Sequence, residues 1–384
     1  MSLRLPGLLA LLALSCPVTA LAQQEPPPPV QAPSPLQQRA IDVYFSAEAA
    51  YRKQDYAGAR ALLQKLWNDV PPGDPAWKRL QRESTQLQAI EDFGTPAAYP
   101  ALRMLTDCVE WKISKRAPAS PPVTVQITVV LVGQSDGPEP DSFDALDDGS
   151  APFTTRTLDP ALQGKRAEPI FDEAYWLFDE YVNAFTQGRI QLHRVYVRLP
   201  GLILHTDPRP NAVHVSRQQT NRVVAAVPAE IARATDWWHI VYPSHVPRGV
   251  AFAHERFVTG GMRAAPGRGR GPCFLSEDSK LLRTANQNGH RTLRDVERRT
   301  ALPQWLQHEL FHYLFAAYRP LGLEATPHQW HDRKAWPSDF VGNVEADYYA
   351  EALHKRLQVQ SELPLHVLLG TRGGRRVAVG PTPE

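Results

Sequence analysis

The chain has 384 residues, and its 42 lysines and arginines nearly balance its 40 aspartates and glutamates, which leaves a formal charge of +2. Domains usually hold roughly 100–200 residues, so this length predicts two structured units. A balanced charge argues against nucleic acid or an anionic membrane surface as the main partner, and the function is therefore sought in a local site.

The first 22 residues have the pattern of a secretory signal peptide. Arg4 precedes an apolar run over residues 8–14, which is too short to span a bilayer, and residues 20–22, Ala-Leu-Ala, fit a cleavage site. We expect cleavage after residue 22 and a secreted or periplasmic location. A lipid anchor at Cys16 is the alternative, although residues 13–15 depart from the usual lipobox, in which leucine leads.

Residues 23–38 are rich in proline and are expected to form a disordered, extended linker, because such a composition cannot pack a core. Once the signal peptide is removed together with Cys16, the mature chain keeps two cysteines, Cys108 and Cys273. An even number of thiols in an oxidising compartment predicts a disulfide between them.

Residues 39–115 predict a small helical region in front of the main domain. The stretch 47–75 resembles one helix pair of the tetratricopeptide type, on residues that suit its turn, its close helix contact, its buried face and its end: Asp55 and Tyr56, Ala59, Leu63 and Leu66, and Pro71. Such pairs normally stack in threes or more, so a single pair is expected to serve as a cap packed against the next domain.

Residues 120–384 predict an α+β domain in which helices pack on a mixed sheet. The domain opens with a buried strand over 121–133, which places apolar residues on one side: Val123, Val125, Ile127, Val129 and Leu131. A helix over 168–187 ends at Gly188, and a strand over 189–199 follows it. A second helix, over about 218–234, leads into a short strand over 237–243, and this alternation predicts the mixed sheet.

The segment 258–273 is rich in glycine and arginine and is expected to be a surface loop, with a place beside the functional site as the alternative. Its glycines do not have the spacing of a phosphate-binding loop that opens a helix.

The stretch "QHELFHYLF", residues 307–315, carries the strongest chemical signal. In a helix, His308 and His312 lie one turn apart, so both imidazoles can reach one zinc ion at about 2.0–2.1 Å. Glu309 beside them suits a general base that takes a proton from the attacking water and passes it to the leaving amine. Pro303 is expected to open this helix. The apolar residues around the motif predict a buried helix, in which a metal would satisfy the polar side chains.

The third metal ligand is expected downstream of the motif. Phe315 and Tyr318 stand where a metzincin-type helix needs glycine and a third histidine, so that class is excluded. A helix expected over 344–357 places Glu345 at the edge of its apolar face, which makes Glu345 the predicted ligand. Other carboxylates and histidines remain candidates: Asp347 and its neighbour Glu351, and Glu324, His328, His331 and Asp332 in a loop.

On these residues the chain resembles the zincin metallopeptidases, and within them the gluzincin type. The resemblance implies a zincin-like fold in which His308, His312 and Glu345 hold one zinc ion per chain and Glu309 acts as the base. It also implies that an edge strand beside the motif helix pairs with an extended peptide substrate, and residues 249–261 or 271–278 are expected to supply that strand.

The predicted function is that of an exported zinc-dependent metallopeptidase acting on a peptide or protein substrate, without nucleic acid and without a membrane span. The alternative is a non-catalytic zincin-like binding or scaffold protein of the cell envelope with a structural metal site. The two differ in coordination, because a catalytic zinc keeps a position open for water whereas a structural zinc has four protein ligands.

Overall fold

The structure of the protein is a computed structural model, which describes residues 33–72, 74, 76–77, 98–115, 123–138, 153–188, 190–209, 212–243, 273–285 and 291–318. The predicted signal peptide with Cys16, and the predicted loop up to residue 272, lie outside the described residues. None of the described helices is long and apolar enough to cross a membrane.

The N-terminal helix α1, Pro35–Arg52, begins inside the segment predicted to be a disordered linker. The Ser34 amide donates to Gln37 Oε1 (2.7 Å), and the Gln37 amide donates to the Ser34 hydroxyl (3.3 Å). These reciprocal bonds form a capping box, which satisfies amides that a helix start otherwise leaves unpaired. The predicted linker end at residue 38 is therefore wrong, because four of its residues are helical.

The predicted helix pair is confirmed by α1 and α2, Tyr56–Asp69, which pack against each other. Asp55 caps α2 by accepting a hydrogen bond from the Gly58 amide (2.9 Å). Leu63 and Leu66, expected on the buried face of α2, and Ala59, expected at its close helix contact, are all buried. A further helix, α4, Ala98–Ser114, packs on α2 and on the helices of the sheet domain.

The central sheet has four parallel strands in the order β3-β1-β6-β7. They are β1 (Val123–Pro138), β3 (Ile190–His205), β6 (Trp237–Tyr242) and β7 (Cys273–Glu277). A short strand, β2 (Phe153–Thr157), pairs antiparallel with the end of β1 and makes the sheet mixed, as predicted. A separate two-stranded ribbon consists of β4 (Asp207–Arg209) and β5 (Ala212–His214).

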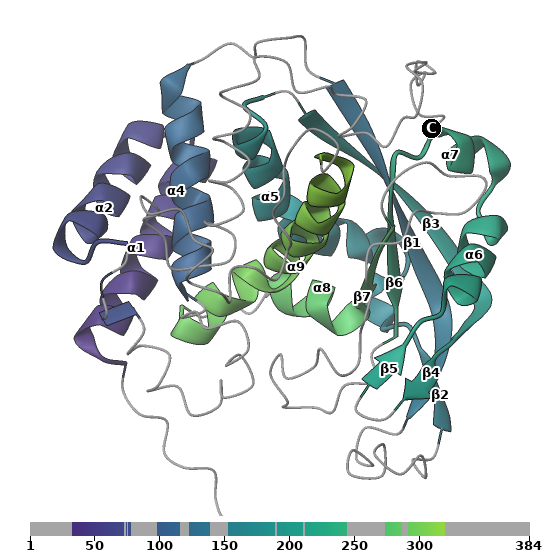
Figure 1. Ribbon diagram of the computed structural model, residues 1–384. Coiled ribbons are helices and arrows are strands. Elements are labelled where there is room, and N and C mark those ends of the chain that lie inside the picture. Colours follow the sequence, from purple (N-terminus) through teal and green to yellow (C-terminus); the bar gives the residue numbers. More distant parts are fainter. Residues whose placement is uncertain are drawn as a thin grey trace, which may run out of the picture. The chain divides into compact units, whose positions relative to one another are not determined.

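Helices cover both faces of this sheet (Figure 1). One face carries α5 (Glu168–Phe185), α8 (Asp278–Ala285) and α9 (Leu293–Tyr318), with the 3-10 turns η3 (Pro160–Leu162) and η4 (Gly164–Ala167) before α5. The other face carries α6 (Arg217–Ala226) and α7 (Ala229–Ala234). The single helix predicted over 218–234 is thus two helices, because Pro228 cannot continue the hydrogen bonding of α6.

The buried side chains form two clusters, one on each face of the sheet. The large cluster joins α1, α2 and α4 through α5 and α9 to β1, and it includes Val125, Ile127, Val129 and Leu131, as the alternation of β1 predicts. The small cluster lies between the sheet and α6 and α7, and it includes Val130 and Val132. The N-terminal helical region therefore shares a continuous core with the sheet domain.

Gly133 interrupts the pairing of β1 with β3. The register shifts between Val132 and Gln134, and a Cβ at Gly133 would lie 2.3 Å from the backbone oxygen of Pro200 in β3. Only a residue without a Cβ fits this close approach of two backbones.

The predicted disulfide is not formed. Cys108 in α4 and Cys273 in β7 are both buried, and neither forms a disulfide. Cys108 belongs to the large cluster and Cys273 to the small cluster, so each sulfur packs as an apolar side chain in its own cluster.

Candidate metal centre on helix α9

Helix α9 carries the His308-Glu309-Leu310-Phe311-His312 motif, and it begins ten residues earlier than predicted. The Thr292 amide donates to Asp295 Oδ2 (2.9 Å) and the Asp295 amide donates to the Thr292 hydroxyl (3.3 Å), which caps the helix start. Pro303 lies inside the helix. The prediction that Pro303 opens the helix is therefore wrong.

Pro303 has no amide hydrogen, so the helical hydrogen bond from residue 303 to the carbonyl of Arg299 cannot form. One residue earlier, the Leu302 amide donates to the Thr284 hydroxyl of α8 (2.8 Å). The structure thus divides α9 into a first half up to residue 302 and a second half, from Pro303 on, that contains the motif.

The second half is fixed on two sides just before and within the motif. The Trp305 indole donates to the carbonyl of Leu275 in β7 (3.1 Å). The side-chain Nε2 of Gln307 donates to the Tyr181 hydroxyl of α5 (3.1 Å). Leu306 and Leu310 are buried in the large cluster. The part of α9 around Trp305 and Gln307 is therefore held between α5 and strand β7.

The predicted ligands are only partly within the described residues. His308, Glu309 and His312 lie on α9, where positions 308 and 312 are one helical turn apart, but their side chains are outside the description. All the downstream candidates lie outside the described residues: Glu345, Asp347, Glu351, Glu324, His328, His331 and Asp332. Among the residues described, no group of three histidine, cysteine, aspartate or glutamate side chains could hold a metal.

The described residues around the motif are buried. Gln307 is buried directly before His308, and its Oε1 has no hydrogen-bond partner. Leu306, Gln307 and Leu310 are all buried, so the face of α9 that they form packs in the interior. Two imidazoles one turn apart are a donor set that suits zinc.

Strand β7 confirms one of the two predicted edge strands as a strand. It pairs with β6 and lies at the end of the described sheet. Its Leu275 carbonyl accepts the Trp305 indole hydrogen bond, so α9 covers this part of its edge. The other candidate, residues 249–261, lies outside the described residues.

A buried polar group that sequence reasoning missed lies under α5. His239 of β6 is hydrogen-bonded at Nδ1 to the Tyr175 hydroxyl (2.6 Å) and at Nε2 to the Ser276 hydroxyl (2.6 Å). Burial, with a smaller contribution from Lys280, lowers the pKa of His239 to about 3, so the ring stays neutral. Tyr175, His239 and Ser276 are completely buried. The serine therefore cannot meet a substrate, and the group serves packing.

A second missed group lies at the carboxyl ends of β1 and β3. His205 Nδ1 and Asp136 Oδ2 are 2.7 Å apart, and the Thr155 hydroxyl donates to Asp136 Oδ1 (2.5 Å). The His205 side chain is 46% exposed. The parallel pairing of β1 with β3 could have pointed to this group, because polar side chains collect at the carboxyl ends of parallel strands.

The chain was compared with known proteins. No family model, no curated protein and no solved structure matches it. The functional argument therefore depends on the residues of α9 and on what packs around them.

Proposed function

We propose that the protein is an exported, zinc-dependent peptidase of the zincin type. The observation that carries this proposal is the placement of the His308–His312 motif within helix α9, next to the sheet-edge strand β7. The packed second half of α9 supports it, because ligands on a rigid element hold a metal more precisely than ligands on a loop.

In this proposal His308 and His312 bind the zinc through neutral imidazoles, and Glu345 provides the third, negatively charged ligand. Bound zinc would supply the Lewis acid that polarises a peptide carbonyl and acidifies water. Glu309 then takes the proton from the attacking water and delivers it to the leaving amine.

The first test is the metal content of the purified mature protein after zinc-replete expression. About one zinc per chain is expected, and the His308→Ala variant should lose it. His205→Ala is the matched control, because it removes an exposed histidine far along the chain from the motif and should keep the zinc. A wild-type protein without any bound metal would overturn the proposal.

The second test separates catalysis from metal binding. Glu309→Gln should keep the zinc and lower hydrolysis of a peptide library by roughly 10²–10⁴-fold, because a general base contributes that much to the rate. Glu345→Ala should weaken zinc binding, whereas Asp347→Ala should retain most of it. Zinc held by four protein ligands, with no cleavage of any peptide, would favour the scaffold protein instead.

A further inference from the structure

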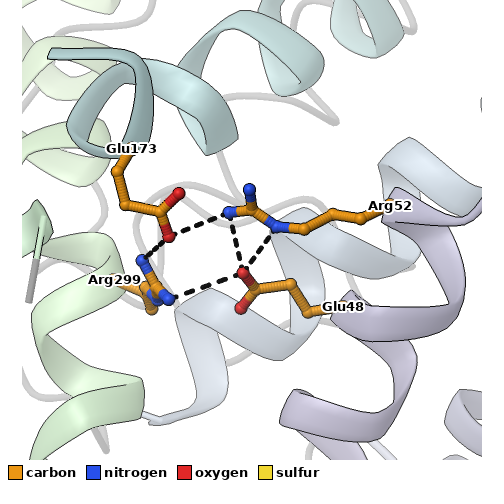
Figure 2. A network of polar contacts seen from close by, with 4 residues as sticks. All are labelled: Glu48, Arg52, Glu173 and Arg299. Carbon is orange, nitrogen blue, oxygen red and sulfur yellow. Dashed lines mark hydrogen bonds and ion pairs between the residues drawn. The ribbon is translucent and has the colours of Figure 1, made fainter. Parts of the chain in front are cut away.

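Four charged side chains form a closed ring of ion pairs between the N-terminal helix and α9 (Figure 2). The members of this ion ring are Glu48 and Arg52 of α1, Glu173 of α5 and Arg299 of α9. Arg52 lies 2.8 Å from Glu48 and 3.0 Å from Glu173, and Arg299 lies 3.6 Å from Glu48 and also pairs with Glu173. Each cation thus bridges the same two carboxylates.

One half of the ring is largely removed from water, whereas the Arg52 and Glu173 side chains of the other half are 35% and 24% exposed. The side chains of Glu48 and Arg299 are 6% and 14% exposed. Burial by itself lowers the pKa of Arg299, but the charges nearby, with Glu48 the largest, raise it overall, so the guanidinium remains charged. Truncating one member would leave two like charges sharing a single partner, and at the buried Glu48 and Arg299 this is more costly than losing an exposed ion pair.

The position of Arg299 along α9 gives the ring a further role. Arg299 is the residue whose carbonyl loses its usual helical partner at Pro303, and the motif begins nine residues after it. A proline inside a helix allows the two halves to change direction relative to each other. The ion ring attaches the first half to α1 and α5 at this point, while Trp305 and Gln307 attach the second half to β7 and α5.

We propose that the ion ring is a positioning device for the metal-bearing half of α9, so that helix α1 controls how tightly the site holds its metal. The inference rests on the proposed zinc site. Glu48, Arg52, Glu173 and Arg299 act through the backbone of α9 and not through contact with the substrate. The N-terminal helical region is then a working part of the metal site and not only a cap.

The test uses the full mature chain with the double substitution Glu48→Gln and Arg299→Met, which removes one charge of each sign and leaves the Arg52–Glu173 pair. The control is Arg39→Ala with Asp69→Ala, which removes an ion pair between α1 and α2. Two quantities are measured: the dissociation constant for zinc by chelator competition, and amide hydrogen exchange over residues 304–312 in the metal-free protein.

The ring variant should bind zinc about tenfold more weakly, as is typical when groups that orient metal ligands are lost. Its amides over 304–312 should exchange about tenfold faster, whereas the control should change neither quantity. If the ring variant only lowers the unfolding midpoint, with zinc affinity and exchange over 304–312 unchanged, the ring is merely structural and the proposal is overturned.

Arg299→Lys is the second variant if the double substitution does not fold. It keeps the charge, but a single ammonium cannot form the two-sided contacts of a guanidinium, so a smaller change in the same direction is expected. If the wild type binds no zinc, the peptidase proposal fails, and the exchange measurement alone then decides whether the ring positions the second half of α9.

Discussion

The two faces of the sheet are built differently, although the same strands supply both. The face of the large cluster is covered by two helical layers, α5, α8 and α9 next to the sheet and α1, α2 and α4 outside them. Among the described residues, the face of the small cluster is covered by α6 and α7, with Trp305 of α9 packed against it. Adjacent tryptophans show the division, because Trp237 faces the large cluster and Trp238 the small one.

The buried polar contacts differ in the same way. On the large face, hydroxyl, imidazole and amide groups connect α5 to strand β6, as in Tyr175–His239, and α9 to α5, as in Gln307–Tyr181. On the small face, the Thr128 hydroxyl is 2.5 Å from that of Thr235. Buried hydrogen bonds fix orientation more strictly than apolar contacts do. On the large face, these contacts fix α5 against strand β6 and α9 against α5.

The largest expected effect comes from truncating the two tryptophans. Trp237→Ala should lower the free energy of unfolding by about 3–5 kcal/mol. Trp238→Ala should cost less within that range, because Trp237 also makes an edge-to-face contact with Phe274 (ring centroids 6.2 Å apart). Urea denaturation followed by circular dichroism measures both. If Trp238→Ala lowers the free energy of unfolding more than Trp237→Ala does, the large face does not contribute more to stability than the small face.

The pH dependence of stability tests His239. Its pKa is about 3 in the folded protein and roughly 6.5 in the unfolded chain. Between these values the unfolded chain binds a proton that the folded protein does not, so stability is complete above pH 6.5 and falls as the pH drops towards 3. The loss is up to roughly 4–5 kcal/mol at pH 3.

His239→Asn should remove this pH-dependent part. Urea midpoints at pH 7, 5.5 and 4.5 should then show wild type and variant converging as the pH falls. Parallel curves for the two proteins would mean that burial of His239 does not control the acid sensitivity.

Removing one hydroxyl on each face gives a smaller, matched comparison. Tyr175→Phe leaves His239 Nδ1 buried without its partner and should cost about 1–3 kcal/mol. Thr235→Val should cost about 1 kcal/mol, because Thr128 retains a distant contact with Gln126 Nε2 (3.5 Å). If thermal unfolding shows that the two variants lose equal stability, buried hydrogen bonds contribute equally on the two faces.

The smallest expected effect concerns the cysteines, one on each face. Burial raises the pKa of the Cys108 thiol, so it should not react in the native protein. Denatured but unreduced protein should give two reactive thiols, and a reductant should leave the unfolding midpoint unchanged. Failure to label either thiol would show that the two are joined after all.

Local sequence signals predicted the elements well where a period was strong. The alternation of β1 placed Val125, Ile127, Val129 and Leu131 on one face, and all four lie in the large cluster. The errors at the linker end and at Pro303 arose at helix starts. The capping boxes at Ser34 and Thr292 were present in the sequence and mark the helix starts, whereas Pro303 lies inside α9.

For the candidate site, the sequence predicted only that His308 and His312 lie one turn apart on the same helix. The contacts that orient α9 join residues far apart in the chain, such as Arg299 with Glu173 and Gln307 with Tyr181, each 126 positions away. No local period or motif encodes such pairs, because they depend on how the helices pack in three dimensions. The same holds for His239, whose partners come from α5 and β7.

Gly133 has a consequence for the sequence variation that this protein tolerates. Most buried positions of β1 accept another aliphatic residue of similar volume with modest loss. At Gly133 even alanine would push the backbone of β3 away at Pro200, because the added Cβ itself clashes there. A complete library of single substitutions should therefore keep only the parent residue at position 133, while its neighbours Val132 and Gln134 vary.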